Sequence, residues 1–127
     1  MISDHVTNMA LRIPAVIAAG VQVLAYSGDL DYICNWMGGQ AWTKNMDWPG
    51  KESFNAATAT DWMVKTEKAG TFWNYKNFTF LRFFGAGHQV PQDKPMQALA
   101  MLEQFINGQL PPPAPSTEEE DFALLQE

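Results

Sequence analysis

Hydrophobic and polar positions divide this chain into short apolar runs and longer segments with helical periodicity. In residues 6–19, apolar side chains recur at near-helical spacing, and Gly20 follows as a carboxy-terminal cap would. The pattern predicts a helix of about twelve residues, which Pro14 must break or kink. Residues 21–27 are mostly apolar and end at Gly28, so they predict a buried parallel strand.

The middle of the chain combines one helical segment with two strand-like runs. Residues 32–45 return to helical spacing, although the glycines at 38–39 weaken the centre by about 1 kcal/mol each. The sequence Trp-Pro-Gly at 48–50 predicts a turn. Two aromatic-rich runs follow, 70–75 and 78–84, and the short separation between them predicts a β-hairpin.

The last helical pattern lies in residues 91–107. Asp93 is placed to cap this helix, and Pro95 suits a first helical turn. Its apolar residues form one stripe, made of Ala98, Leu99, Leu102, Phe105 and Ile106. Pro-rich and acidic sequence follows, so we expect one domain over residues 1–110 and a disordered tail over residues 111–127.

The order of these elements predicts the fold class. Helix, strand, helix, hairpin and helix follow one another, which is typical of an α/β layer in which helices flank a sheet. Such sheets bind ligands at the carboxyl ends of their strands.

Composition excludes several classes of partner. The formal net charge is -6, but Glu118, Glu119, Glu120, Asp121 and Glu127 account for most of it, so the rest of the chain is nearly neutral. No basic patch predicts a nucleic-acid partner, and no apolar stretch approaches the roughly 18 residues of a membrane span. The single cysteine, Cys34, cannot form a disulfide within this chain.

Candidate chemistry is concentrated where two apolar runs end. The sequence Gly-Asp-Leu-Asp at 28–31 follows the first run, and Gly-Ala-Gly-His-Gln-Val-Pro at 85–91 follows the second. A buried carboxylate can hold an imidazole in one tautomer and balance its positive charge while it takes a proton from a serine. Asp31 precedes His88, which fits the order Ser, Asp, His of α/β-hydrolases.

The same aspartates and histidine can also have purely structural roles. His88 can be a loop residue bonded to backbone, and Asp29 and Asp31 can close a turn or cap the helix that follows them. Spacing alone does not choose between these roles.

Two segments, residues 24–38 and 78–95, resemble the carboxy-terminal part of the serine carboxypeptidase family, in the group of carboxypeptidase Y and cathepsin A. The resemblance implies the carboxy-terminal part of an α/β-hydrolase fold, with an incomplete sheet flanked by helices. It implies that Asp31 is the triad aspartate, that His88 is the general base and that Asp29 is a structural acid of the turn.

The resemblance also implies a substrate pocket. Ile33 and Cys34 match positions that line the pocket for the residue before the scissile bond, and Gln89 borders the pocket for the departing residue. Gln89 replaces a methionine of the family pattern, so preference at that pocket is open. Alternatively, Cys34 is a buried, unreactive cysteine. We expect no cofactor and no metal.

The family's nucleophilic serine has no counterpart here. None of Ser3, Ser27, Ser53 and Ser116 lies in a Gly-x-Ser-x-Gly frame. We therefore expect the carboxy-terminal part of a serine-type carboxypeptidase, inactive alone, whose partners are a peptide carboxy terminus and the missing amino-terminal portion of the same enzyme. Two alternatives stay open: a carboxypeptidase-like acyltransferase or other α/β-hydrolase, and a non-catalytic fragment or pseudoenzyme that acts as a binding module.

Cellular location is indicated only indirectly. The resemblance implies a vacuole, a lysosome or the outside of the cell, and Asn-Phe-Thr at 77–79 is a glycosylation sequon that agrees with that route. No basic start or apolar core of a signal peptide follows Met1. Either the chain is cytosolic or its true amino terminus lies elsewhere.

Overall fold

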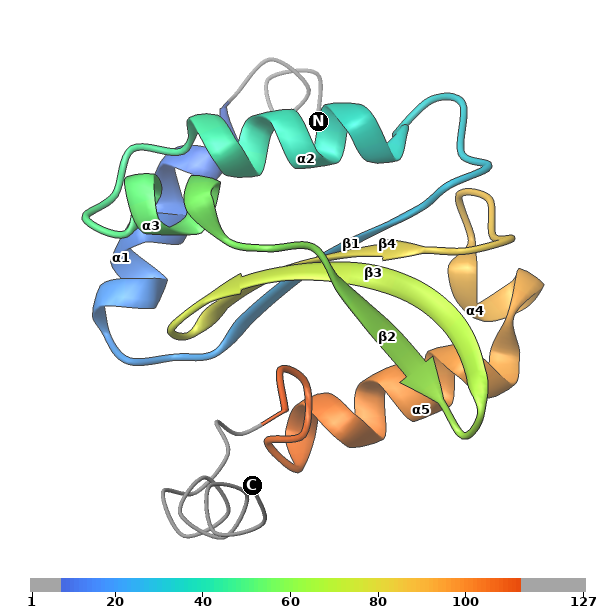
Figure 1. Cartoon of the computed structure of the whole chain (residues 1–127). Coiled ribbons are helices and arrows are strands. Elements are labelled where there is room, and N and C mark those ends of the chain that lie inside the picture. Colours follow the sequence, from blue (N-terminus) through green and yellow to red (C-terminus); the bar gives the residue numbers. More distant parts are fainter. Residues whose placement is uncertain (1–7, 113–127) are drawn as a thin grey trace, which may run out of the picture.

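The computed structural model describes residues 8–112, which fold into a four-stranded mixed sheet with helices on both faces (Figure 1). The elements are the 3-10 helix η2 (Met9–Arg12), α1 (Ile13–Ala18), β1 (Val23–Gly28), α2 (Trp36–Asn45), α3 (Lys51–Ala56), β2 (Thr60–Val64), β3 (Glu67–Tyr75), β4 (Phe78–Phe83), α4 (Val90–Asp93) and α5 (Pro95–Ile106). The strand order across the sheet is β1-β4-β3-β2. The predicted α/β class is confirmed.

The ends of β1 and β4 lie side by side. The two strands pair in parallel, from Val23 opposite Phe78 to Gly28 opposite Phe83, which confirms the prediction that the first run forms a parallel strand. Because both strands end at the same edge of the sheet, the loops that carry Asp31 and His88 meet there.

The predicted hairpin is formed by β3 and β4, and its turn is tied to the helix before β1. Nδ2 of Asn77 donates to the carbonyl oxygens of Ile17, at 2.9 Å, and Val21, at 2.7 Å. A glycan at the sequon would be attached to this nitrogen. Modification would replace one of the two N–H donors, so it would cost at least one of these hydrogen bonds.

Two apolar cores lie on opposite faces of the sheet, because side chains alternate along β4. Phe78 and Phe80 belong to the core under α1, α2 and α3, whereas Leu81 and Phe83 belong to the core over α4 and α5 (Figure 1). The first core also contains Ile17, Met46, Trp48 and Phe54; the second also contains Trp62, Ala69, Phe72, Ala86, Val90, Ala98, Met101 and Leu110.

β1 is only half-buried, which corrects the prediction of a buried strand. Its one neighbour among the described strands is β4, and Tyr26 is 43% exposed. Full burial of a parallel strand needs a neighbour on each edge and cover on both faces.

The amino-terminal helices differ from the prediction in their boundaries. The first helical segment is divided into η2 and α1, because Pro14 lies in the first turn of α1, where its missing N–H is not needed. Gly20 follows α1 with φ of 80°, as predicted for a cap. α2 begins later than the predicted residue 32, because Oδ1 of Asn35 caps it by accepting the N–H of Gly38 at 2.8 Å.

Two elements, α3 and β2, were not predicted. α3 is too short for a helical period to show clearly. In β2 the register shifts between Trp62 and Met63, and this bulge breaks the alternation that marks a strand.

The carboxy-terminal helix is divided at Lys94 into α4 and α5. Pro95 lies in the first turn of α5 as predicted, but the prediction that Asp93 caps the helix is wrong, since its side chain makes no cap bond there. The predicted apolar stripe is only partly buried, because Leu99, Leu102 and Ile106 are all more than half exposed.

Among residues 8–112, no helix combines the length and apolarity that crossing a bilayer requires. Residues 113–127 lie outside the described part, so the boundary at residue 110 and the disordered tail stay predictions.

Candidate active site

The site is built where the loops after β1 and β4 cross. Gly28 allows this approach, since a Cβ atom there would collide with the carbonyl oxygens of Ala86 and Gly87. The backbone N–H of Asp29 donates to the carbonyl of Phe83 at 2.9 Å, and the N–H of Leu30 to Ala86 at 3.0 Å. The two loops therefore continue the pairing of the strands beyond their ends.

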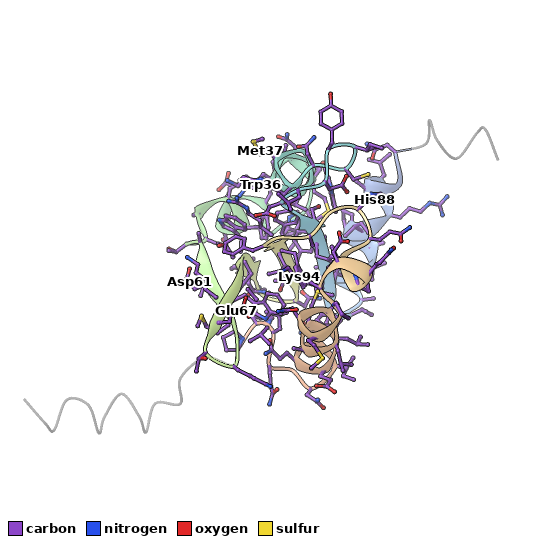
Figure 2. All side chains as sticks on the ribbon, turned by 90° about the vertical axis from the view of Figure 1, so that its right-hand side faces the viewer. Trp36, Met37, Asp61, Glu67, His88 and Lys94 are labelled. Atoms are coloured by element: carbon purple, nitrogen blue, oxygen red, sulfur yellow. The ribbon has the colours of Figure 1, made fainter. Side chains whose placement is uncertain are left out.

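Asp31 and His88, the two predicted catalytic residues, are in direct contact. Nδ1 of His88 lies 2.8 Å from Oδ2 of Asp31. The Asp31 side chain is 6% exposed and the His88 side chain 65% exposed. Figure 2 looks at this end of the sheet and shows His88 at the surface. The structure thus places a buried carboxylate behind an accessible imidazole.

The other oxygen of Asp31 is occupied by backbone. Oδ1 accepts the N–H groups of Ile33 and Cys34, each at 3.0 Å. Burial of the Asp31 carboxyl raises its pKa, but the hydrogen bond from His88, the two N–H bonds and the positive charge that His88 can carry outweigh burial. The pKa therefore lies below its ordinary value of 3.8, and the carboxyl is ionised at neutral pH.

The ionised carboxylate determines the tautomer of His88. A carboxylate only accepts hydrogen bonds, so Nδ1 must carry the proton, and Nε2 of the neutral ring is left with its lone pair. An exposed Nε2 of this kind can accept a proton from a hydroxyl, and Asp31 can stabilise the resulting imidazolium.

The three residues predicted to line the substrate pocket are all exposed, but they differ in how they contact Asp31 and His88. Cys34 is exposed, so the alternative of a buried cysteine is wrong, and its sulfur lies within 4.8 Å of ligand atoms of Asp31 and His88. Ile33 is 84% exposed and touches Asp31 through its backbone N–H. Gln89 is exposed and is the residue between His88 and the start of α4 at Val90. The roles of Ile33 and Gln89 toward a substrate stay predictions.

Asp31, Cys34 and His88 also present a carboxylate, a thiol and an imidazole close together. These are donor types that zinc uses. The carboxylate and imidazole already satisfy one another through their hydrogen bond, so the geometry of the pair does not depend on an ion.

Sequence reasoning missed the contacts that fix the histidine loop. Oδ1 of Asp29 accepts the N–H of Gly85 at 2.8 Å, and Oδ2 of Asp93 accepts the N–H of Gly87 at 2.7 Å. The sequence did carry one signal, because Asp29 was expected to be a structural acid. Its partner, Gly85, could not be predicted, since Gly85 lies in the loop after β4, far from Asp29 in the sequence.

Arg82 was also missed as part of this region. Its guanidinium carbon lies 4.0 Å from the ring centre of Trp36, and Nη2 lies 3.8 Å from Oδ2 of Asp29. The side chain thus connects β4, the first turn of α2 and the loop after β1.

Comparisons with known proteins show the family to which this chain belongs. A family model described as serine carboxypeptidase matches residues 1–108. The chain therefore belongs to the serine carboxypeptidase family, a family of serine-type proteases.

Individual relatives are similar to this chain over limited parts of their length. Carboxypeptidase Y of Candida albicans is 51% identical over 86 residues, which is 68% of this chain and 16% of that protein. Serine carboxypeptidase-like 48 of Arabidopsis thaliana is 40% identical over 114 residues, 90% of this chain and 22% of that protein. The chain thus spans only 16% to 22% of the length of these two relatives.

A solved structure supports the same fold. The crystal structure of a prohormone-processing carboxypeptidase from Saccharomyces cerevisiae superposes with a TM-score of 0.69 at 27% identity, over 78% of this chain and 22% of that one. The mixed sheet with its flanking helices is therefore similar to part of a serine carboxypeptidase.

Proposed function

We propose that this chain supplies the acid and base of a serine-type carboxypeptidase, within the carboxy-terminal part of an α/β-hydrolase fold. The observation that carries the proposal is the 2.8 Å contact between His88 and the buried Asp31 at the ends of two adjacent parallel strands. Family membership supports it, because the chemistry of this class requires such a pair.

In the proposed mechanism, a serine hydroxyl attacks the last peptide bond of a substrate while Nε2 of His88 takes its proton. His88 then passes the proton to the departing amine, and water releases the shortened peptide from the serine by the reverse proton route. Asp31 keeps the ring oriented and balances its charge in both steps.

The nucleophilic serine is proposed to come from sequence outside residues 8–112. Within this part of the chain, Ser27 lies in β1 with its hydroxyl against Gly39, and Ser53 lies on α3. Neither forms a hydrogen bond with His88 in the described structure. Ser3 and Ser116 lie outside the described residues, and neither stands in a Gly-x-Ser-x-Gly frame, so we expect the chain alone to be inactive.

The same proposal assigns a partner to the open side of the sheet. The outer edge of β1 has no neighbour among the described strands, and a groove of about 560 Å³ lies beside it, lined by Leu24, Tyr26, Leu102 and Phe105 among others. We propose that the amino-terminal portion of the same enzyme pairs with this edge and covers the groove. The greater length of the relatives supports this assignment.

The proposed substrates are the carboxy termini of peptides. Ile33, Cys34 and Gln89 are exposed around the pair, which supports their assignment to pockets on either side of the scissile bond. The apolar side chain of Ile33 favours an apolar residue before that bond. A vacuolar, lysosomal or secreted location is proposed from the family alone.

A grafted enzyme tests the function. Residues 21–108 of this chain replace the corresponding segment of Candida albicans carboxypeptidase Y, and release of the last amino acid from an amino-blocked dipeptide is measured. The graft is expected to be active, and His88→Ala to lower kcat by at least about 10⁴-fold. The control Asp61→Asn changes an exposed carboxylate on β2 and should leave kcat unchanged.

Three outcomes would contradict the proposal. These are an inactive but folded graft, a His88→Ala graft that keeps its activity, and release of the amino acid by the 127-residue chain alone. Transfer of the acyl group to an added alcohol in preference to water would instead favour the acyltransferase.

A further inference from the structure

The loop before His88 is held by carboxylates that take no part in the proposed proton transfers. This loop runs from Gly85 to His88, and Gly85 adopts φ of 69°, a conformation that side chains rarely permit. Such a loop needs external contacts to stay in one arrangement. Two of its backbone N–H groups, at Gly85 and Gly87, donate to carboxylate oxygens.

The two carboxylates approach the loop from different elements. Asp29 follows β1 and accepts the N–H of Gly85 at 2.8 Å, while Asp93 ends α4 and accepts the N–H of Gly87 at 2.7 Å. Hydrogen bonds to a charged acceptor are shorter and about twice as strong as neutral ones. His88 therefore follows directly after a segment fixed at two points.

Asp29 is also joined to the catalytic pair through the backbone. Only Leu30 separates it from Asp31, and its own N–H donates to the carbonyl of Phe83 at 2.9 Å. The residue thus contacts the β4 side of the site through both main chain and side chain. A shift of either loop would stretch these bonds and change the distance between Asp31 and His88.

Arg82 balances the charge of Asp29. The Asp29 side chain is 18% exposed, and the guanidinium of Arg82 lies 3.8 Å from its Oδ2. Trp36 and Phe84 flank the same guanidinium, with its carbon 4.0 Å and 5.2 Å from the two ring centres. This cation therefore offsets part of the cost of holding a half-buried carboxylate at the loop.

We propose that Asp29 and Asp93 are positioning residues, which hold the loop 85–88 so that Nδ1 of His88 meets Asp31. We call these two carboxylates the loop clamp. The effect of the loop clamp on catalysis rests on the proposed function, whereas its effect on the hydrogen bond between His88 and Asp31 does not.

Exchange of the Nδ1 proton of His88 tests the loop clamp in the 127-residue chain. The proton is observed by nuclear magnetic resonance after ¹⁵N labelling of histidine, and His88→Gln identifies its signal against that of His5. Asp29→Ala removes the acceptor for Gly85, and is expected to speed exchange by about tenfold or more, the scale of one charged hydrogen bond. Asp29→Asn keeps an acceptor oxygen and should change exchange by less than about threefold.

Asp93→Ala and Asp93→Asn repeat the comparison at Gly87, and carry the test alone if Asp29→Ala does not fold. Asp61→Ala is the matched control, because it removes an exposed carboxylate on β2 and should leave exchange unchanged. Urea denaturation of each variant separates a local effect from a general loss of stability.

The proposal is overturned if the parent chain has no protected Nδ1 proton, if the alanine and asparagine variants behave alike, or if Asp61→Ala speeds exchange equally. An inactive grafted enzyme would contradict the proposed function but leave these results standing. Unchanged exchange in both alanine variants would refute the positioning role of the loop clamp, whether or not the grafted enzyme is active.

Discussion

Replacing Asp31 by asparagine is expected to reverse the tautomer of His88. The asparagine amide can lie in two orientations, which differ in whether its oxygen or its NH₂ faces His88. Hydrogen bonds from the backbone favour one of them. The N–H groups of Ile33 and Cys34 both donate to Oδ1 of Asp31 at 3.0 Å, so the amide oxygen must stay on that side. The amide NH₂ then faces Nδ1 of His88 and donates to it.

The consequence is a histidine with its proton on the wrong nitrogen. Nδ1 becomes an acceptor and Nε2 carries the hydrogen, so the ring cannot take a proton from a serine. The loss expected for such a tautomer change in a serine hydrolase is about 10⁴-fold in kcat. The measurement is kcat of the grafted enzyme with and without Asp31→Asn, together with the ¹⁵N shifts of His88 in the 127-residue chain.

The two readouts can refute the reasoning separately. A ¹⁵N spectrum of Asp31→Asn that still shows protonated Nδ1 would mean that the backbone donors do not control the amide. A loss of kcat below about tenfold, despite the reversed tautomer, would mean that His88 is not the general base. Asp31→Ala serves as a comparison, because it removes the partner of Nδ1 without imposing a tautomer.

Three further predictions concern packing, loop approach and pH. Phe54→Ala should lower the free energy of unfolding in urea by about 3–5 kcal/mol, because Phe54 is 1% exposed; a loss below about 1 kcal/mol would contradict this packing. Gly28→Ala should separate the two loops and unprotect Nδ1 of His88, whereas Gly38→Ala, where a Cβ meets ordinary contacts, should not; equal behaviour would refute the close approach. The lowered pKa of Asp31 means that its stabilisation is present above about pH 4 and is lost as pH falls through the folded pKa, so the stability difference between the parent and Asp31→Asn should shrink in acid; a constant difference would argue against it.

Contact between Asp31 and His88 could be expected from the sequence, whereas the choice of Asp31 over Asp29 and the proposed catalytic roles came from the family resemblance. Each member follows an apolar run that ends in glycine, and parallel strands bring such ends together. The loop clamp could not be predicted in the same way. Asp93 is placed like a helix cap in the sequence, but its carboxylate turns toward Gly87, and only the three-dimensional path of the loop shows this.

Boundaries were less predictable than the elements themselves. Asp31 and Asn35 both have side chains that accept nearby backbone N–H groups, so either can precede a helix. The structure uses Asn35 as the cap and leaves Asp31 to bind His88. Periodicity does not distinguish the two, because it records apolar positions and not the direction of a carboxylate.

Some apolar residues of β1 and α5 that the hydrophobic pattern predicts to be buried are exposed in the structure. The runs in β1 and α5 predict burial, yet Tyr26 is 43% and Leu102 53% exposed, and both line the same groove. A large apolar surface of this kind marks a binding face more often than free surface. The pattern is consistent with burial by sequence beyond residues 8–112, which is the role proposed for the amino-terminal portion. If that portion covers the groove, Leu102→Asp should weaken its association with this chain and leave the contact between His88 and Asp31 unchanged.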